Sequence, residues 1–349
     1  SLDPLILLTS ISTTLFKAAT YSFTQIFNPE KSNEPTVDPY PHPAAFEAWF
    51  NYSYSFFNSK LGLDWDLVWE ARRMLSGTGY YGAPAPGDIS LLNYYCSDNV
   101  FSYTFLSRGD STQQAINGDW KGGVDVSSLQ TAEWVALAWH YWYKNQSDPT
   151  SVAPYLSLGK GPLGTCHGLS KVPYMRDSRR SIGIDDFLLN LSSITGPVNQ
   201  TVGEIFPDRM ALGAYNVDFH RLQNGCEFPS YMNNLERYTV LPYYIPFRAL
   251  TNAGIDNLLV AGKTMAQSFL ANAATRLHPV EWSSGTASGV VAAYMVANSI
   301  SSTAKLYANP QQLKEVQSLA TKFTPNRWYI NNTYYPYARF FSPFPPVSS

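Results

Sequence analysis

The segment Leu258-Leu-Val-Ala-Gly262 is a short, continuous apolar run that ends at a glycine. Such a run is typical of a buried β-strand, and the glycine lets another group approach the backbone closely. Residues 283–300 follow with the sequence SSGTASGVVAAYMVANSI, which predicts a helix whose Gly285 and Gly289 permit tight packing on a sheet. Its two leading serines would stand at a helix start, where unpaired N–H groups and the positive dipole end lie. The stretches therefore indicate either an anion or cofactor site or an ordinary strand-loop-helix packing unit.

Composition narrows the class of protein. The chain has 349 residues, enough for one large domain or two ordinary ones, and a formal net charge of -2. It has no long basic run, so a nucleic-acid-binding function is disfavoured. Only 14% of the residues are charged and 15% are aromatic, so the chain has abundant apolar surface to bury and is predicted to fold.

Residues 1–45 are interpreted as an N-terminal packing segment followed by a proline-rich linker. The sequence opens Ser1-Leu-Asp-Pro4 without Met, which favours a processed or truncated chain. Residues 1–27 predict an amphipathic helix or a pair of strands, and they lack the length of apolar sequence that a membrane span needs. Residues 28–45 contain five prolines and predict an extended linker or surface loop.

Residues 46–170 are interpreted as a helical, aromatic-rich substrate or lid region. Apolar residues near helical spacing predict one helix over residues 46–75 and a second over residues 128–144, the latter capped by Ser127 or Ser128. Loop-rich sequence occupies the remainder, at residues 82–125 and 145–170.

Cysteine spacing and glycosylation sequons bear on the cellular compartment. Cys96, Cys166 and Cys226 form no CxxC pair, so a zinc knuckle is excluded and no metal site is expected. They allow one internal disulfide with a free thiol, three buried thiols, or one bridge to another chain. The low lysine content and five sequons favour a secreted, extracellular glycoprotein. The sequon asparagines are Asn51, Asn145, Asn190, Asn199 and Asn331.

Three local motifs leave their roles open. Gly77-Thr-Gly-Tyr-Tyr-Gly82 matches G-x-G-x-x-G, but a charged helical pattern precedes it and prolines follow, so we interpret it as a glycine-rich loop. Arg176, Arg179 and Arg180 form either a buried ion-pair hub or an anion-binding site. Asp218-Phe-His220 predicts a strand that carries either a catalytic base with its orienting partner or a structural pair.

In order along the chain, these pieces resemble the C-terminal half of FAD-dependent oxidoreductases. The resemblance covers about residues 170–300 well and is weaker upstream, at Asn117–Asp125, which resembles a substrate-side loop. The matching motifs are Pro173-Tyr-Met-Arg-Asp-Ser-Arg-Arg180 with Gly183, Asp218-Phe-His220, Tyr244-Ile-Pro-Phe-Arg-Ala-Leu250, Asn257-Leu-Leu-Val-Ala-Gly-Lys263, and Arg276-Leu-His-Pro279 leading to Gly285-Thr-Ala-Ser-Gly289.

The resemblance implies an α/β, FAD/NAD(P)-binding, glutathione-reductase-like fold with a helical, loop-rich substrate domain. This chain taken alone would be α+β. Residues 171–305 would then form the C-terminal part of the FAD-binding and substrate domains, and residues 306–349 a C-terminal helix with an aromatic, proline-rich tail. The helix at residues 283–300 would direct its N-terminus at the flavin N1/O2 edge. FAD would be bound by Gly262, Lys263, Arg276, Leu277, His278, Pro279, Val280 and Glu281.

The resemblance also suggests residues for substrate binding and catalysis. We expect the substrate to be held by Arg176, Arg179 and Arg248. Hydride transfer to a flavin usually needs a nearby base, and the candidates for catalysis are His220, His278, Tyr244 and Arg180.

This sequence departs from the family in one large respect: it lacks the N-terminal βαβ unit with a glycine-rich turn that holds the ADP half of FAD. The resemblance therefore implies a secreted heterodimer, produced by proteolytic processing, in which a companion chain supplies that dinucleotide-binding unit. There are smaller departures: Lys263 replaces the usual arginine, Phe247 the tyrosine, Ala249 the serine and Val280 the threonine, so fewer polar contacts to the flavin are expected. The alternatives are a non-catalytic secreted glycoprotein that retains the fold as a binding module, and a hydrolase that uses His220 and Asp218.

Overall fold

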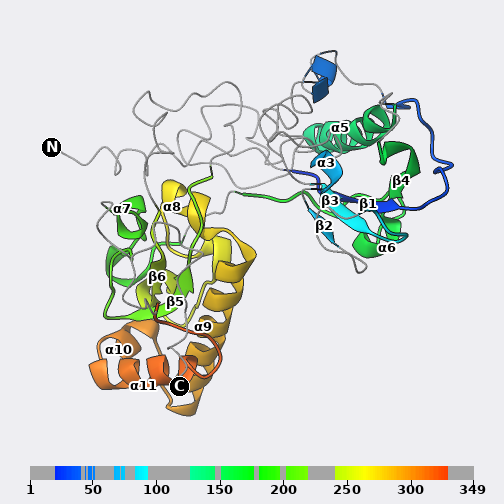
Figure 1. Cartoon of the computed structure of the whole chain (residues 1–349). Coiled ribbons are helices and arrows are strands. Elements are labelled where there is room, and N and C mark those ends of the chain that lie inside the picture. The colour runs from blue at the N-terminus through cyan, green and yellow to red at the C-terminus, as the bar shows by residue number, and fades with distance from the viewer. Residues whose placement is uncertain are drawn as a thin grey trace, which may run out of the picture. The chain divides into compact units, whose positions relative to one another are not determined.

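A computed structural model of the chain divides into two compact units (Figure 1). One contains the described residues between 20 and 175, and the other those between 176 and 328. The structure describes residues 20–40, 44, 46–48, 50–51, 67–70, 72–74, 83–92, 126–145, 151–176, 181–196, 202–218 and 240–328.

A four-stranded antiparallel sheet organises the unit of residues 20–175. Its strands lie in the order β2-β3-β1-β4. In the central strand β1, Phe23 pairs with Leu92 of β3 and Gln25 pairs with Leu158 of β4. The strands are β1 (Phe23–Phe27), β2 (Arg73–Met74), β3 (Ile89–Leu92) and β4 (Leu156–Leu158).

Helix α5 (Val126–Lys144) lies over this sheet (Figure 1) and supplies eight of the 19 described core residues of the unit. Its residues Trp139 and Tyr143 are fully buried and stack with ring centroids 5.1 Å apart. Trp139 also contacts Phe23 of β1, so the aromatic residues that predicted the helix are those that join it to the sheet. The unit's other elements are α3 (Leu67–Glu70), η1 (Ala153–Tyr155) and α6 (Lys160–Leu163).

The unit of residues 176–328 is built on a two-stranded antiparallel sheet, β5 (Arg209–Gly213) with β6 (Tyr243–Pro246). Helix α9 (His278–Ala297) packs along β5 (Figure 1). Gly213 is required where the ring of Tyr243 crosses the sheet, because a Cβ atom there would overlap that ring. The remaining elements are η2 (Ile184–Asp186), α7 (Leu191–Ile194), η5 (Phe247–Leu250), η6 (Gly262–Thr264), α8 (Phe269–Thr275), α10 (Thr303–Tyr307) and α11 (Pro310–Ala320).

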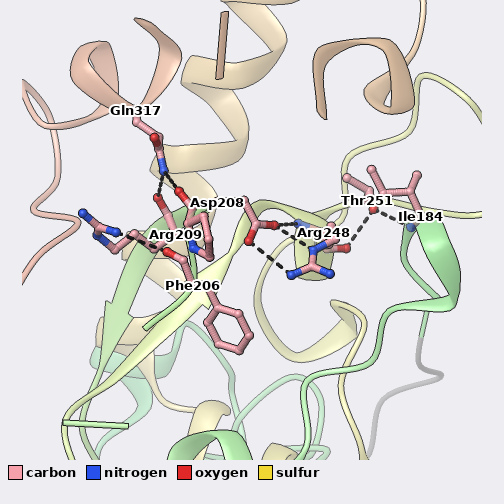
Figure 2. A network of polar contacts seen from close by, with 8 residues as sticks. Ile184, Phe206, Asp208, Arg209, Arg248, Thr251 and Gln317 are labelled. Atoms are coloured by element: carbon pink, nitrogen blue, oxygen red, sulfur yellow. Dashed lines mark hydrogen bonds and ion pairs between the residues drawn. The ribbon is translucent and has the colours of Figure 1, made fainter. Parts of the chain in front are cut away.

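Polar contacts fasten α11 and η5 to the start of β5 (Figure 2). The Gln317 side-chain amide donates to the carbonyl oxygens of Pro207 and Arg209, at 2.8 and 2.9 Å. The Asp208 carboxylate accepts from the backbone N and the Nε atom of Arg248, at 3.2 and 3.0 Å. Both contacts meet at the irregular pairing of β5 with β6, where the register shifts between Arg209 and Ala211.

Several predicted elements are confirmed. The helix over residues 128–144 is α5, which begins two residues earlier, so Ser127 and Ser128 lie in its first turn instead of capping it. Residues 28–40 form a loop, as predicted for the proline-rich segment. The strand alternative for the N-terminal segment is correct over Phe23–Phe27.

Other predictions are wrong. Residues 258–261 form no strand; they are exposed or half-buried, and only the backbone N of Val260 is bonded in the manner of a strand, to Leu250. The helix expected over residues 46–75 gives way to β2 at Arg73–Met74. The described part of the region 46–170 contains helices, as expected, but it also contributes three strands to a sheet, which the sequence did not predict. Asp218 lies outside any strand.

The helix expected at residues 283–300 begins and ends earlier, because α9 spans His278–Ala297. Pro279 is compatible with this early start, since proline is favoured in the first turn of a helix. Gly285 and Gly289 do not pack on a sheet within the described residues: a Cβ atom at either would meet nothing within 4 Å. Among the described helices, none is both long and apolar enough to span a membrane.

Candidate cofactor site

The structure brings together two segments that the sequence assigned to cofactor binding. Gly262 and Lys263 open η6, and Glu281 lies in the first turn of α9. The backbone N of Lys263 donates to Oε1 of Glu281 at 3.1 Å, and the backbone N of Gly262 donates to Oγ of Ser284 at 3.0 Å. These bonds hold η6 against the beginning of α9.

Gly262 occupies a position that only glycine fills without strain. Its φ is 65°, in the left-handed region that L-residues with a Cβ atom seldom adopt. A Cβ atom there would also overlap the carboxylate of Glu281. The close approach that the sequence predicted for this glycine is therefore an approach by Glu281.

A buried polar network holds the carbonyl side of the same loop. The Lys263 carbonyl oxygen accepts from the side-chain amides of Gln267 and Asn272, at 3.0 and 3.5 Å. Gln267 in turn accepts from the Thr275 hydroxyl, and all three side chains are buried. Sequence reasoning missed Gln267, Asn272 and Thr275, because nothing in their local pattern distinguishes them from ordinary structural residues. It placed Ser284 at a helix start but did not predict its contact with Gly262.

Among the described residues, nothing covers the first two residues of α9. Leu277 is its N-cap and makes no side-chain capping bond, and His278 and Pro279 are exposed. The positive end of a 20-residue helix favours a negatively charged group, such as the flavin edge that gains charge on reduction. Pro279 has no N–H, and the backbone N atoms of Val280 and Glu281 donate to the Leu277 carbonyl oxygen, so the helix dipole is what this terminus offers to a flavin.

The backbone N–H groups of Gly262 and Lys263 are not free to bind a phosphate of FAD. Both already donate to side chains of α9, so a phosphate could bind them only if Ser284 and Glu281 moved. The structure thus provides an open helix end beside a loop whose N–H groups are satisfied internally.

Arg276 orients the segment that enters α9. Its Nη2 atom lies 2.5 Å from Oδ2 of Asp218, and the Arg276 side chain is only 4% exposed. The Tyr215 hydroxyl also donates to this carboxylate, at 3.4 Å. Asp218 is therefore an ion-pair partner of Arg276; His220, the residue predicted to work with Asp218, lies outside the described residues.

Arg248 is held in place by its neighbours (Figure 2). It forms an ion pair with Asp208, and its guanidinium lies 4.4 Å from the ring centre of Phe187 and 5.3 Å from that of Tyr307. Burial acts to lower the pKa of Arg248, but the hydrogen bond and charge of Asp208 outweigh it and raise the pKa. A substrate anion would have to compete with Asp208 for this side chain.

The other proposed substrate and catalytic residues are only partly described. Arg176 is buried, with 4% of its surface exposed, and Arg179 and Arg180 lie outside the described residues. Tyr244 is buried in β6, where its hydroxyl accepts from the backbone N of Trp328 at 3.3 Å. His278 is the one candidate base in the described residues that is exposed at the start of α9.

The sequon asparagines and cysteines are described in part. Asn51 and Asn145 are exposed, and Asn190 is half-buried. Asn199 and Asn331 lie outside the described residues. Cys166 is an exposed free thiol, whereas Cys96, Cys226 and the glycine-rich loop 77–82 also lie outside the part that the structure describes.

The unit of residues 20–175 has a cavity of about 680 Å³ beneath the proline-rich loop. Glu34 fixes one wall: its carboxylate accepts from Nε2 of His140 at 2.8 Å and from the backbone N of Leu158 at 3.1 Å. Tyr40 and Tyr141 stack beside it with ring centroids 6.0 Å apart. The cavity is lined by Asn28, Glu30, Lys31, Ser32, Asn33, Glu34, Pro35, Tyr40, Leu137, Tyr141, Ser157, Leu158, Lys160, Cys166 and His167.

The buried pair in this wall has shifted ionisation. Burial lowers the pKa of His140. Burial acts to raise the pKa of Glu34, but the hydrogen bond and charge of His140 and the bond from Leu158 outweigh it, so the pKa is lowered. Gln25 donates to Nδ1 of His140 at 2.7 Å, which assigns the ring proton to Nε2 and lets the neutral imidazole donate to Glu34.

The sequence was compared with models of known protein families. The model of a family described as FAD dependent oxidoreductase matches residues 83–318, about two thirds of the chain. The chain belongs to the FAD dependent oxidoreductase family. The cofactor of this family is FAD. The match includes η6, α8 and α9, so the loop and helix end described above lie within the FAD dependent oxidoreductase region. No curated protein and no solved structure matched the chain.

Proposed function

We propose that this chain is one polypeptide of a secreted, two-chain enzyme that transfers a hydride from a small organic substrate to FAD. The observation that carries the proposal is the contact of η6 with the open start of α9, made through Lys263 and Glu281. Both segments belong to the motif set by which the sequence resembles the family, and the family match supports a redox function with a flavin.

Each residue near this helix end has a proposed task. FAD, when bound, supplies the acceptor for the substrate hydride. The dipole of α9 stabilises negative charge beside the helix start. His278 is exposed there and takes the substrate proton, and Arg276, locked onto Asp218, orients the segment that presents His278.

The companion chain provides what this sequence lacks. No apolar strand followed by a glycine-rich turn and a helix is present in the sequence, and Gly262 and Lys263 already spend their N–H groups on α9. A companion with a glycine-rich dinucleotide-binding unit would hold the pyrophosphate and adenosine parts of FAD.

The proposal is tested on the protein secreted and purified under native conditions. We expect the absorption bands of oxidised flavin, and intact-mass spectrometry should show a second polypeptide whose peptides contain G-x-G-x-x-G after an apolar strand. Finding the glycine-rich unit on the same polypeptide would refute the two-chain part alone. A colourless preparation that takes up no added FAD would refute the flavoenzyme.

A non-catalytic binding module is the second candidate. One contact favours it: the Glu281 carboxylate occupies the Lys263 N–H and brings negative charge to the predicted cofactor loop. This alternative predicts that Glu281→Gln does not change ligand binding. It also predicts that no electron donor reduces a flavin in the presence of the protein, so the flavin absorbance stays constant. Flavin reduction by a small organic donor would decide for the enzyme.

A further inference from the structure

The cavity beneath residues 28–40, which we call the loop cavity, is a second place where this chain can hold a small molecule. Its volume of about 680 Å³ lies within the range of small-molecule sites, about 300–1,000 Å³. Every residue that lines it belongs to the unit of residues 20–175. Neither η6 nor α9 contributes to the lining, so the loop cavity is distinct from the candidate cofactor site.

The wall formed by the loop is already fastened to the rest of the unit. The backbone N of Ser32 donates to the carbonyl oxygen of Pro154 at 3.1 Å. The Glu34 carboxylate accepts from His140 and from the backbone N of Leu158. A wall that is ordered before a ligand arrives loses little conformational entropy when the ligand binds.

Tyr141 brings an unsatisfied hydroxyl group to the loop cavity. It lines the cavity from α5, and only 8% of its surface is exposed. Its hydroxyl makes no hydrogen bond to any residue in the part of the chain that the structure describes. Burial, with the charge of Glu34, raises the pKa of this hydroxyl to about 12, so it stays protonated at neutral pH. Such a group favours a ligand that offers an acceptor.

The rest of the lining combines polar groups with an aromatic surface. Asn33 and Ser157 can each donate and accept hydrogen bonds. Tyr40 stacks beside Tyr141 with ring centroids 6.0 Å apart. Sugars carry hydroxyl groups around the ring and C–H groups on its faces, so amide and hydroxyl side chains beside tyrosine rings suit them.

The charges of the lining balance one another. Lys31 and Lys160 supply two positive charges, and Glu30 and Glu34 supply two negative charges. An anionic or cationic ligand would meet like charges as well as opposite ones. The lining therefore favours a polar ligand without net charge.

We propose that the loop cavity binds a neutral carbohydrate, which accepts a hydrogen bond from the Tyr141 hydroxyl and contacts Asn33 of the loop. This gives the unit of residues 20–175 a binding site of its own. The inference does not rest on the proposed FAD site, because the two sites share no residue.

The experiment measures sugar binding by calorimetry on the natively purified protein. The probes are cellobiose, maltose and N,N′-diacetylchitobiose, with sulfate and glutamate as charged comparisons. Tyr141→Phe removes only the hydroxyl group, and Asn33→Ala removes an exposed amide of the loop. Tyr155→Phe is the matched control, because Tyr155 is half-buried in the same unit but does not line the loop cavity.

We expect at least one disaccharide to bind at millimolar concentration. Binding should weaken about fivefold in Tyr141→Phe and in Asn33→Ala, as expected for the loss of a hydrogen bond, and stay unchanged in Tyr155→Phe. Cys166 is an exposed thiol of the lining, so the bound sugar should also slow its alkylation by iodoacetamide.

Three results would overturn the inference. The first is that none of the disaccharides binds. The second is that Tyr141→Phe and Tyr155→Phe bind the sugar equally well. The third is that sulfate or glutamate binds in place of the sugars.

Discussion

At the scale of single residues, Gly262 is the position where backbone conformation and the candidate site meet. Its positive φ disfavours a side chain, and a Cβ atom would also displace the Glu281 carboxylate from its bond to Lys263. Gly164 is a matched control, because its φ is 64° and a Cβ atom there meets nothing within 4 Å. Gly164→Ala should therefore cost only the strain of the left-handed region, about 1–2 kcal/mol.

We predict that Gly262→Ala lowers the free energy of unfolding more than Gly164→Ala, because it adds overlap with Glu281 to the same strain. Urea denaturation of the two variants measures the difference. Equal losses would show that Glu281 does not constrain this glycine.

The pair of Arg248 and Asp208 predicts a coupled loss of stability. Asp208 is buried and accepts two bonds from the guanidinium, at 3.0 and 3.4 Å. Removing either partner leaves the other without its main contact, so Asp208→Asn and Arg248→Gln should each cost about 2 kcal/mol. In a double-mutant cycle, the double variant should lose much less free energy of unfolding than the sum of the losses of the two single variants. Additive losses would contradict the pairing.

His140 predicts a dependence of stability on pH. Burial lowers its pKa in the folded protein, while the unfolded chain takes up a proton near the ordinary value of 6.5. The unfolded state therefore binds more protons than the folded state as the pH falls, so the free energy of unfolding decreases when the pH is lowered through the ordinary value of 6.5. Glu34 adds a loss in the same direction only below its ordinary pKa of 4.5. His140→Gln should flatten the curve in this pH range; a curve parallel to that of the wild type would show that His140 takes up its proton equally in the folded and unfolded states.

At the scale of elements, the sequence predicted correctly those helices whose formation depends on the spacing of nearby apolar residues. The apolar periodicity of residues 128–144 predicted α5 correctly, because the side chains that this helix buries recur at helical spacing. The strand predicted at residues 258–261 is absent. A short apolar run forms a strand only where another strand pairs with it, and the local sequence does not show whether such a partner exists. The start of α9 was placed five residues late because the serines at 283 and 284 suggested caps, whereas both are buried and bind neighbouring elements.

Ser284 and Ser288 stand one turn apart in α9 and provide a matched test of how this helix holds η6. Ser284 Oγ accepts from the Gly262 backbone N, whereas Ser288 Oγ has no hydrogen-bond partner among the described residues. Ser284→Ala should lower the free energy of unfolding by about 1–2 kcal/mol, and Ser288→Ala should leave it nearly unchanged. Thermal and urea unfolding of both variants check this, and equal effects would contradict the anchoring role.

At the scale of the whole molecule, the order of motifs was sufficient to predict the family and its cofactor. The partners of the arginines were not predictable, because Asp208 lies 40 residues from Arg248 and Asp218 lies 58 residues from Arg276. Such pairs are set by tertiary structure, which no local spacing encodes. The contact of Lys263 with Glu281 was predicted only in part. The motifs assigned both residues to the flavin site, but they did not indicate that the two residues bind each other.

The ratio of FAD to protein in two tryptophan variants tests whether η6 and the start of α9 form the cofactor site. Gly262→Trp inserts a large ring between η6 and Glu281, whereas Gly164→Trp adds the same ring at the same φ in open space. Both are purified natively beside the wild-type protein, and bound flavin is measured by absorbance. We predict wild-type FAD content in Gly164→Trp and loss of most FAD in Gly262→Trp. Full FAD content in a folded Gly262→Trp variant would contradict the assignment.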